Sequence, residues 1–236
     1  LNKGGVDPVI LERSSRERVL SRIRACVLES GTVRMLEEAG VSERAHAEGH
    51  VHQGCYLTDD DLMVRINFQE LTGQQVLVYG QTEVTKDLYM AQERFGTTIL
   101  HNVDDVEICN VDSSAPVVTF LQEGERKQLD CMYVAGCDGF HGVSRKTIPV
   151  EKRSEFERVY PFGWLGVLSN TKPANKELIY SNSSNGFALA SMRSETMSRY
   201  YVQVSTKDKV EEWSDDRFWE KLQKCLPSSV ANSMET

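Results

Sequence analysis

Helix-like and strand-like patterns alternate along the first part of this 236-residue chain, and beyond Pro149 the alternation stops. From there strand patterns dominate through Val204, separated by short polar turns. Alternating elements are typical of a sheet covered by helices, whereas a run of strands is typical of an antiparallel sheet with its own core. The sequence therefore predicts a mixed α/β (α+β) chain, with an α/β domain over residues 1–154 and a mainly antiparallel β-sheet domain over residues 155–236.

Local patterns give the elements of these domains. The apolar run 9–11 predicts a short strand, and residues 16–40 follow a helical pattern that ends at a glycine. A second helix is expected over residues 82–94. A hairpin is expected from the strands 117–121 and 129–135, and an amphipathic helix capped by Ser214 is expected near the end of the chain.

Composition excludes several classes of partner. The chain is 40% hydrophobic and 26% charged, with 27 basic and 35 acidic residues and a net charge of -8. This balance, with no block of lysines and arginines, argues against nucleic-acid binding. No apolar stretch approaches the roughly 20 residues of a membrane span, and the first thirty residues do not resemble a signal peptide. A cytoplasmic protein is expected.

Cysteine and histidine spacing does not predict a metal site. The six cysteines form no CxxC pair. His50 and His52 could share one face of a strand, but no third ligand lies at a recognisable spacing, so both are interpreted as ordinary surface or loop histidines.

Glu12 ends the first predicted strand, where a dinucleotide-binding βαβ unit carries an acidic residue that hydrogen-bonds a ribose. The glycine-rich phosphate turn of such a unit lies about 20 residues earlier, which places it before residue 1. The chain is therefore expected to begin within a Rossmann-like fold. Strand-terminal glutamates are common, so this pattern alone leaves the role open.

Two further groups could meet a nucleotide. Arg22 and Arg24 could contact a pyrophosphate, although residues two apart in a helix point to different sides, so both would serve one ligand only at a helix terminus or in a loop. Asp138 enters a glycine-containing turn where it could accept a hydrogen bond from a ribitol or ribose hydroxyl. An exposed helix face and an ordinary Asp-Gly turn remain the alternatives.

The strands 187–193 and 199–204 predict an antiparallel hairpin. Simple mirror pairing across the turn sets Arg193 opposite Arg199 and Ser191 opposite Tyr201, all four on one sheet face. Two facing cations repel each other, so this face calls for an anion or an acidic side chain nearby, and a small carboxylate ligand would supply the anion. An outer polar sheet face is the alternative. Tyr180, expected at the end of a neighbouring strand, could reach a second polar group of the ligand.

Six segments resemble a known enzyme family. They are Ile10–Arg13, Arg22–Ala25, Tyr79–Thr85, Ala135–Gly142, Tyr160–Gly166 and Ser198–Val204. Together they resemble the group A FAD-dependent aromatic hydroxylases, and several are specific to the members that act on 4-hydroxybenzoate. The resemblance runs through essentially the whole chain.

The resemblance implies chemistry that a cofactor performs. In this family NADPH reduces FAD, and O2 adds to the reduced flavin as a C4a-hydroperoxide. Its terminal oxygen is transferred to the ring carbon beside the phenol, which gives 3,4-dihydroxybenzoate. The protein orients the ring, excludes water and favours the phenolate. A homodimeric enzyme of benzoate degradation is expected.

The resemblance also implies cofactor-binding residues. Glu12 is expected to hold the FAD ribose, Gln81 and Arg24 to contact FAD, and Asp138 to bind near the ribityl chain. Contacts to NADPH fall on four residues: Arg13, Arg22, Arg24 and His141. Ser14 and Arg18 depart from the glutamine and tyrosine of well-known NADPH-using relatives, and Cys26 replaces a glycine, so NADH remains an alternative to NADPH.

The substrate site follows from the same resemblance. Ser191, Arg193 and Tyr201 are expected to bind the substrate carboxylate, as the hairpin argument suggests independently. Tyr180 is expected to hydrogen-bond the phenol and help to draw off its proton. Arg199 is expected to help position the flavin ring.

Part of the enzyme is expected to lie outside this chain. A second FAD motif and a second phenol-contacting tyrosine would follow Thr236, so the isolated chain is expected to be an inactive internal fragment. Two alternatives to the 4-hydroxybenzoate enzyme stay open. One is a hydroxylase for a related acid such as 3-hydroxybenzoate or 4-aminobenzoate, and the other is a non-catalytic protein that binds aromatic acids without FAD.

Overall fold

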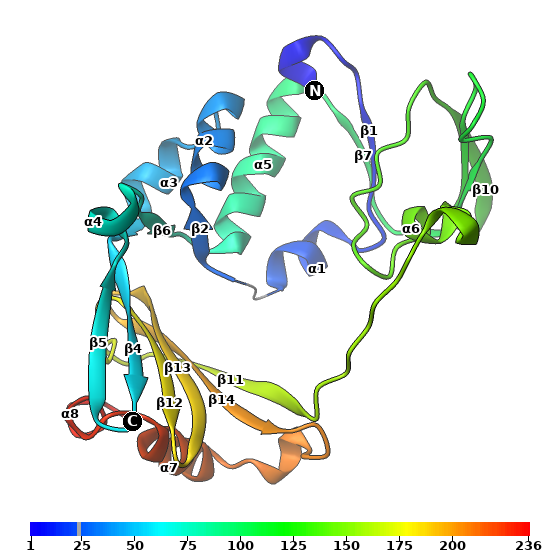
Figure 1. Ribbon diagram of the computed structural model, residues 1–236. Coiled ribbons are helices and arrows are strands. Elements are labelled where there is room, and N and C mark those ends of the chain that lie inside the picture. Colours follow the sequence, from blue (N-terminus) through cyan, green and yellow to red (C-terminus); the bar gives the residue numbers. More distant parts are fainter. Residues whose placement is uncertain (23–24) are drawn as a thin grey trace. The chain divides into compact units, whose positions relative to one another are not determined.

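The computed structural model describes residues 1–22 and 25–236 (Figure 1). The chain divides into two compact units, unit 1 with Leu1–Arg22 and Tyr89–Arg158, and unit 2 with Ile23–Leu88 and Val159–Thr236. The boundary after Arg158 lies close to the expected one, but unit 2 also contains residues 23–88. Strand pairing explains this difference, because β4 (Gly54–Asp59) runs parallel to β12 (Leu178–Ser183) in one sheet.

The main sheet of unit 2 has six strands in the order β11-β14-β13-β12-β4-β5. The remaining strands are β5 (Leu62–Asn67), β11 (Phe162–Ser169), β13 (Gly186–Ser194) and β14 (Met197–Ser205). All neighbours are antiparallel except β12 and β4. The prediction of a mainly antiparallel sheet in a mixed α/β chain is confirmed.

One face of this sheet packs against α7 (Asp215–Cys225) and α8 (Ser228–Ala231), which lie along it in Figure 1. Ser214 caps α7 as predicted, because its hydroxyl accepts a hydrogen bond from the backbone N–H of Arg217 at 3.3 Å. Tyr200 and Leu222 are fully buried in this core. Burial alternates along β13 and β14, so every second side chain lies on the opposite face.

A smaller antiparallel sheet of unit 2 has the order β2-β6-β3, with β2 (Val27–Glu29), β3 (His50–His52) and β6 (Val76–Val78). Its neighbours are the helices α2 (Ser30–Ala39), α3 (Glu43–Glu48) and α4 (Phe68–Thr72), and α5 (Gln81–Phe95) begins three residues after β6. Figure 1 shows α2, α3 and α5 grouped around this sheet. The predicted helix 82–94 is confirmed as α5, which runs from unit 2 into unit 1.

The single helix expected over residues 16–40 is wrong. The structure has α1 (Arg16–Ser21) and α2, with β2 between them. β2 forms because Val27 and Leu28 pair with Val78 and Leu77 of β6, and this tertiary pairing overrides the local helical pattern. The predicted end at Gly40 is correct, since Gly40 adopts a left-handed φ of 74° after the last turn.

Unit 1 contains the parallel pair β1 (Val9–Leu11) and β7 (Thr98–Leu100). It also contains an antiparallel sheet β10-β9-β8, formed by β8 (Val103–Cys109), β9 (Val117–Gln122) and β10 (Glu125–Asp130), and the short helix α6 (Val143–Thr147). Among the described residues there are also 3-10 turns at Asn2–Gly4, Val150–Lys152 and Val210–Glu212. The expected hairpin is confirmed, although its second strand ends at Asp130 rather than continuing to residue 135.

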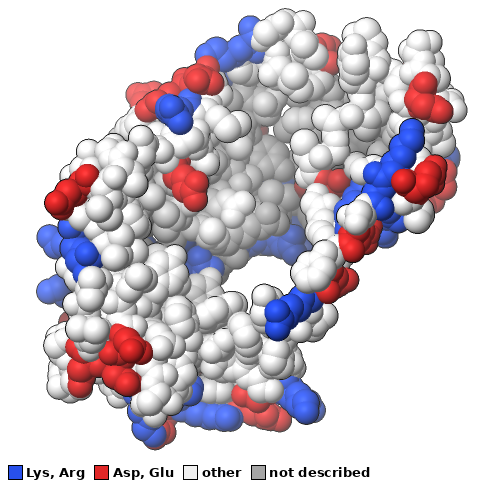
Figure 2. Space-filling model, viewed as in Figure 1, with Lys and Arg blue, Asp and Glu red and all other residues white. Residues whose placement is uncertain are grey.

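Surface properties agree with the composition. On the face shown in Figure 2, lysine and arginine side chains are mixed with aspartate and glutamate side chains. Within residues 1–22 and 25–236, no helix is long and apolar enough to cross a membrane.

Candidate functional site

The β13–β14 hairpin has a different register from simple mirror pairing. Ser191 pairs with Arg199, and Leu189 pairs with Tyr201. The register shifts between Met192 and Ser194, which leaves Arg193 in a β-bulge. The expected pairs Arg193–Arg199 and Ser191–Tyr201 are therefore wrong, and so is the argument that two arginines repel each other across the strands.

Three of the four residues still lie on one sheet face, as predicted. The observed register differs from the predicted one by two residues, and side chains alternate with period two, so Ser191, Arg199 and Tyr201 still lie on one face. The Ser191 hydroxyl donates to the carbonyl oxygen of Arg199 at 3.2 Å. The Arg199 guanidinium lies over the Tyr201 ring, 4.8 Å from its centroid, which fixes both side chains as a cation–π pair.

Two phenols flank the middle of this face. Tyr180 of β12 pairs with Leu189 of β13, which pairs with Tyr201 of β14, so both phenols lie on one face of adjoining strands. Tyr180 lies in the middle of β12 rather than at a strand end as expected. Because neighbouring strands are about 4.8 Å apart, the two tyrosine-bearing strands are about 10 Å apart. That spacing accommodates one aromatic ring with a polar group at each end.

We name these residues, Tyr180, Leu189, Ser191, Arg199 and Tyr201, the hairpin face. Tyr180 is 38% exposed. Partial burial raises the pKa of its phenol, so the hydroxyl stays protonated at neutral pH and can donate a hydrogen bond.

Gly166 of β11 makes room for the Tyr201 ring. It pairs with Tyr201, and a Cβ atom at position 166 would lie 2.6 Å from Cε1 of that ring. A side chain there would displace the phenol. The segment Tyr160–Gly166 therefore contributes a glycine whose function is to let Tyr201 lie close to the backbone of β11.

Arg193 has a buried donor without a protein partner. Its Nη1 is buried and makes no hydrogen bond to any part of the chain that the structure describes. The guanidinium lies beside Gly80, since a Cβ atom there would be 3.4 Å from Nη2 of Arg193. A buried, unsatisfied donor on a charged group is costly, and a ligand that supplies an acceptor removes that cost.

Gln81 is the first residue of α5, directly after the turn that contains Gly80. Its backbone N–H donates to Ala25 at 3.0 Å, and Tyr79 donates to Cys26 at 2.7 Å, so the turn is tied to the strand that begins at Val27. The Gln81 carbonyl accepts from the Thr85 hydroxyl at 2.8 Å. The backbone around the expected FAD contact is thus well fixed.

Glu12 lies directly after β1, as predicted. Its backbone continues the pairing with the neighbouring segment, and its Oε1 accepts from the Ser14 N–H at 2.7 Å. Arg13 follows it, and Arg22 is the C-terminal cap of α1. Arg22 therefore lies at a helix terminus, while the interpretation that Arg22 and Arg24 serve one ligand stays a prediction. Arg24 falls outside the described residues.

The Asp138 carboxylate organises the glycine-containing turn. Its Oδ2 accepts from the Ser144 N–H at 2.9 Å, and this backbone hydrogen bond lowers the pKa of the carboxyl. A Cβ atom at Gly142 would overlap the Asp138 carboxyl group, so a side chain there would displace this carboxylate. Gly139 has a φ of 74°, another conformation that glycine favours. His141 is exposed and packs edge-on against Phe140.

Two features of unit 2 were not predicted from the sequence. His52 is buried rather than on the surface, and burial lowers the pKa of its imidazole. It lines a cavity of about 500 Å³ together with six residues: Val51, Gln53, Tyr56, Asn175, Lys176 and Glu177.

Arg44 is the second feature. It bonds carboxylates that are distant in sequence, and only its spacing of four residues from Glu48 signalled an ion pair. Among the described residues, no three His, Cys, Asp or Glu side chains could hold a metal ion.

Comparisons with known proteins show the family of this chain. A family model described as FAD binding domain matches residues 1–235. The chain is 48% identical over 237 residues to p-hydroxybenzoate hydroxylase of Acinetobacter baylyi. That alignment covers 100% of this chain and 58% of the relative, so the chain spans little more than half of the relative's length.

Solved structures share the fold. PqsL of Pseudomonas aeruginosa, determined in complex with 2-aminobenzoylacetate, superposes with a TM-score of 0.79 at 17% identity, over 98% of this chain and 64% of that protein. p-Nitrophenol 4-monooxygenase PnpA of Pseudomonas putida also gives a TM-score of 0.79, at 14% identity, over 97% of this chain and 59% of that protein.

Proposed function

This chain belongs to the family of FAD binding domains, and from that premise we propose that the full-length protein is an FAD-dependent monooxygenase. Its proposed reaction converts 4-hydroxybenzoate to 3,4-dihydroxybenzoate with NAD(P)H and O2. One observation carries the substrate class. The buried Nη1 of Arg193 lacks a partner among the described residues, and Arg193 lies near the hairpin face, which carries two phenols. The 48% identity to p-hydroxybenzoate hydroxylase supports this substrate.

The residues present fit FAD. Glu12 ends a strand that runs parallel to its neighbour, where a carboxylate can accept from a ribose hydroxyl. The Asp138 turn contains Gly139, where a Cβ atom would meet nothing within 4 Å, so a ligand can approach the backbone closely there. Glu12, Arg24, Gln81 and Asp138 are the proposed FAD-binding residues. When bound, FAD supplies the redox chemistry and the activation of O2.

Arg193 is proposed to bind the substrate carboxylate. Its planar guanidinium can form two parallel charge-assisted hydrogen bonds to a carboxylate, which would satisfy the buried Nη1. The hydroxyls of Ser191 and Tyr201 would add further donors. The Ser191 hydroxyl would turn from the Arg199 carbonyl, to which it donates in this structure, toward the ligand.

Tyr180 is proposed to act at the other end of the ring. Because burial raises the pKa of its phenol, Tyr180 remains a donor and can stabilise the substrate oxygen as it loses its proton. A substrate phenolate releases more electron density into the ring than a phenol does, and this favours attack by the ring carbon beside the oxygen. Leu189 lies between the two tyrosines and offers an apolar surface for the ring.

Arg199 is proposed to position the flavin ring, and its cation–π contact with Tyr201 would couple that role to the substrate-binding residues. Four residues are proposed to contact NADPH: Arg13, Arg22, Arg24 and His141. NADH is the alternative reductant. A cytoplasmic homodimer of benzoate degradation is the proposed setting of the enzyme.

The test is to measure NADPH oxidation by the full-length protein with and without 4-hydroxybenzoate, and to identify the product by chromatography. Stimulated oxidation with 3,4-dihydroxybenzoate as product would support the proposal. If 3-hydroxybenzoate or 4-aminobenzoate, assayed in the same way, stimulates oxidation and is hydroxylated while 4-hydroxybenzoate is not, the substrate is a related acid. A purified protein that binds these acids but contains no flavin would instead favour the non-catalytic binding protein.

A further inference from the structure

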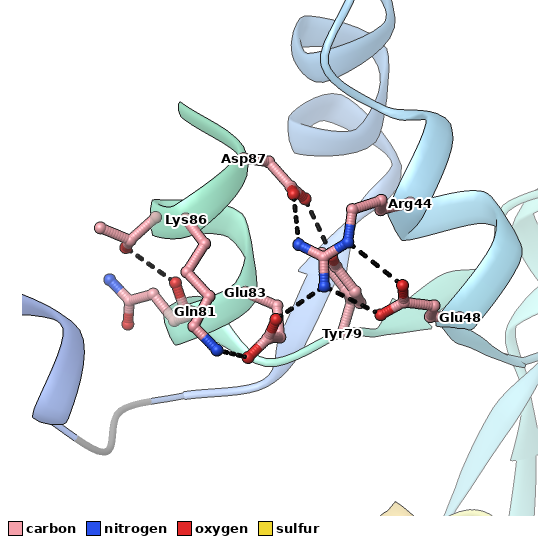
Figure 3. Close-up of polar contacts among 8 residues, drawn as sticks. Arg44, Glu48, Tyr79, Gln81, Glu83, Lys86 and Asp87 are labelled. Carbon is pink, nitrogen blue, oxygen red and sulfur yellow. Dashed lines mark hydrogen bonds and ion pairs between the residues drawn. The ribbon is translucent and has the colours of Figure 1, made fainter. Parts of the chain in front are cut away.

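Arg44 of α3 hydrogen-bonds three carboxylates at once (Figure 3). Its Nε and Nη2 each donate to Glu48 at 3.1 Å, Nη2 also donates to Glu83 at 2.8 Å, and Nη1 donates to Asp87 at 2.5 Å. These partners lie on two helices, Glu48 on α3 and the other two on α5. A planar guanidinium fixes the direction of each bond, so Arg44 sets the position of α5 relative to α3.

Asp87 extends this arrangement to a third segment. Its Oδ2 accepts from the Tyr79 hydroxyl at 2.8 Å, and both side chains are buried, with exposed fractions of 5% for Asp87 and 4% for Tyr79. Burial and the adjacent carboxylate raise the pKa of the Tyr79 phenol, so it remains a hydrogen-bond donor. We call the five residues Arg44, Glu48, Tyr79, Glu83 and Asp87 the Arg44 network.

The segment that the network holds is the turn from Tyr79 to Gln81. Tyr79 is its first residue, and Glu83 lies in the first turn of the helix that follows. The N–H groups of Glu83 and Val84 donate to the carbonyl oxygen of Gly80, at 2.8 and 3.1 Å, which closes the start of α5. Figure 3 shows Gln81 on α5, the helix that also carries Glu83 and Asp87.

Two proposed binding residues border this turn. Gln81 is the proposed FAD contact, and Gly80 lies so close to the Arg193 guanidinium that a Cβ atom at position 80 would be 3.4 Å from Nη2 of Arg193. A shift of the turn would therefore move the Gln81 side chain and change the space available to Arg193 together. Because a misplacement of about 1 Å can cost about 100-fold in rate, the precision of this turn matters.

We propose that the Arg44 network positions the Tyr79–Gln81 turn, so that one rigid turn places Gln81 for FAD and Arg193 for the substrate carboxylate. The inference rests on the proposed function for the roles of Gln81 and Arg193. Arg44, Asp87 and Tyr79 are positioning residues, since they act through the turn.

The experiment uses the full-length protein with three substitutions, Tyr79→Phe, Arg44→Lys and Arg44→Met. The dissociation constant of FAD is measured by titrating the apoprotein, and that of 4-hydroxybenzoate by the absorbance change of bound flavin. Tyr79→Phe removes one hydrogen bond and keeps the ring, so it serves as the variant that folds if Arg44→Met does not.

Two control variants separate positioning from general stability. Val230→Ala removes buried methyl groups from the core next to α8 and lowers the melting temperature without touching the turn. Arg126→Met removes an arginine that makes two hydrogen bonds to Asp105 within the β10-β9-β8 sheet of unit 1. Both controls are expected to keep the wild-type dissociation constants.

We expect Tyr79→Phe to weaken FAD binding by about 3- to 10-fold and Arg44→Met by more, with a parallel loss for 4-hydroxybenzoate. Arg44→Lys keeps the charge but not the planar fork, so it should restore part of both affinities. If the Arg44 and Tyr79 variants lose melting temperature as Val230→Ala does and keep both affinities, the positioning role is disproved.

The FAD measurement needs no substrate, which keeps the two proposals distinguishable. A wild-type protein that binds FAD but gives no absorbance change with 4-hydroxybenzoate would contradict the proposed substrate. In that case a weakened FAD affinity of Tyr79→Phe would still support the positioning role, and an unchanged one would still overturn it.

Discussion

Arg44 and Arg193 belong to the same compact unit but differ in their partners. Arg44 donates to three carboxylates, whereas Nη1 of Arg193 is buried without a partner in the described part of the chain. A satisfied guanidinium contributes to the stability of the fold, and a buried unsatisfied one costs stability until a ligand pairs with it. The comparison separates the arginine that the fold uses for its own structure from the one that remains available to a ligand.

The same distinction implies opposite effects of substitution. Replacing the satisfied arginine leaves the buried Asp87 carboxylate without its cationic partner, so the ligand-free protein should become less stable. Replacing the unsatisfied arginine removes a buried charge without such a loss, so stability should stay the same or rise while ligand affinity falls. Sites of binding commonly show this exchange of stability for function.

Arg193→Met should have the largest effect. We expect it to weaken 4-hydroxybenzoate binding by about 100- to 1000-fold, because charge-assisted hydrogen bonds contribute about 1.5–3 kcal/mol each. The melting temperature of the ligand-free protein should not fall. Flavin absorbance titration and thermal unfolding measure the two quantities. Arg193→Lys is the matched control, with an intermediate affinity expected, and wild-type affinity in Arg193→Met would exclude Arg193 as the carboxylate partner.

Arg44→Met should destabilise the ligand-free protein by about 2 kcal/mol, because Asp87 would remain buried without its cationic partner. The expected cost is below that of a fully buried pair, since the Arg44 side chain is 35% exposed. Urea unfolding measures the change. The control Arg126→Met breaks a pair exposed by about half, and should change stability by no more than about 0.5 kcal/mol. Equal losses of stability in both variants would mean that Arg44 stabilises the fold no more than an ordinary surface arginine does.

Gly166→Ala tests whether the Tyr201 phenol binds the same ligand as Arg193. A Cβ atom would lie 2.6 Å from the Tyr201 ring, so the ring must move. Loss of one hydrogen bond of about 1 kcal/mol predicts about a 5- to 10-fold weaker affinity for 4-hydroxybenzoate. Gly163→Ala on the same strand, where a Cβ atom meets nothing within 4 Å, is the control. An unchanged substrate affinity in Gly166→Ala would separate Tyr201 from the binding site.

Much of the fold follows from the sequence because its signals are local. Period-two alternation in 187–204 predicted the hairpin, and the shared face of Ser191, Arg199 and Tyr201 survived a register error because that error was two residues. The bulge at Arg193 was not predictable, since it depends on how the turn closes between Ser194 and Met197. Strand β2 was missed because its partner β6 is almost 50 residues away in the sequence.

The candidate site also has a part that follows from local sequence patterns and a part that depends on long-range contacts. Glu12 at the end of a strand and the Asp138 turn are local patterns, and the structure has both. The Arg44 network combines residues up to 43 positions apart, so no spacing rule reveals it. The Nη2 of Arg193 lies beside Gly80, which comes from a distant part of the sequence. Long-range partners of charged residues are therefore the part of the site that required the structure.

The comparison of arginines extends to a third one, Arg65, which binds a single carboxylate. Substitution of this partner is predicted to have the smallest effect. Its Nε and Nη2 donate to Glu177 at 2.6 and 2.8 Å, and this pairing lowers the pKa of the Glu177 carboxyl. A carboxyl with a lowered pKa contributes stability that is present above its unfolded-state pKa of about 4.3 and is lost as the pH falls through its folded-state pKa.

Glu177→Gln should therefore be about 1 kcal/mol less stable than the wild type at pH 7, and the difference should shrink as the pH falls below about 4.3, because glutamine does not titrate. Urea unfolding at several pH values measures this. Glu220→Gln, which removes the partner of Lys224 on the exposed side of α7, should change the pH dependence less, because solvent screens that pair. A constant difference between wild type and Glu177→Gln at every pH would mean that Arg65 does not bind the ionised form preferentially. Arg65 would then contribute through packing, unlike Arg44, whose partners must be charged to hold it.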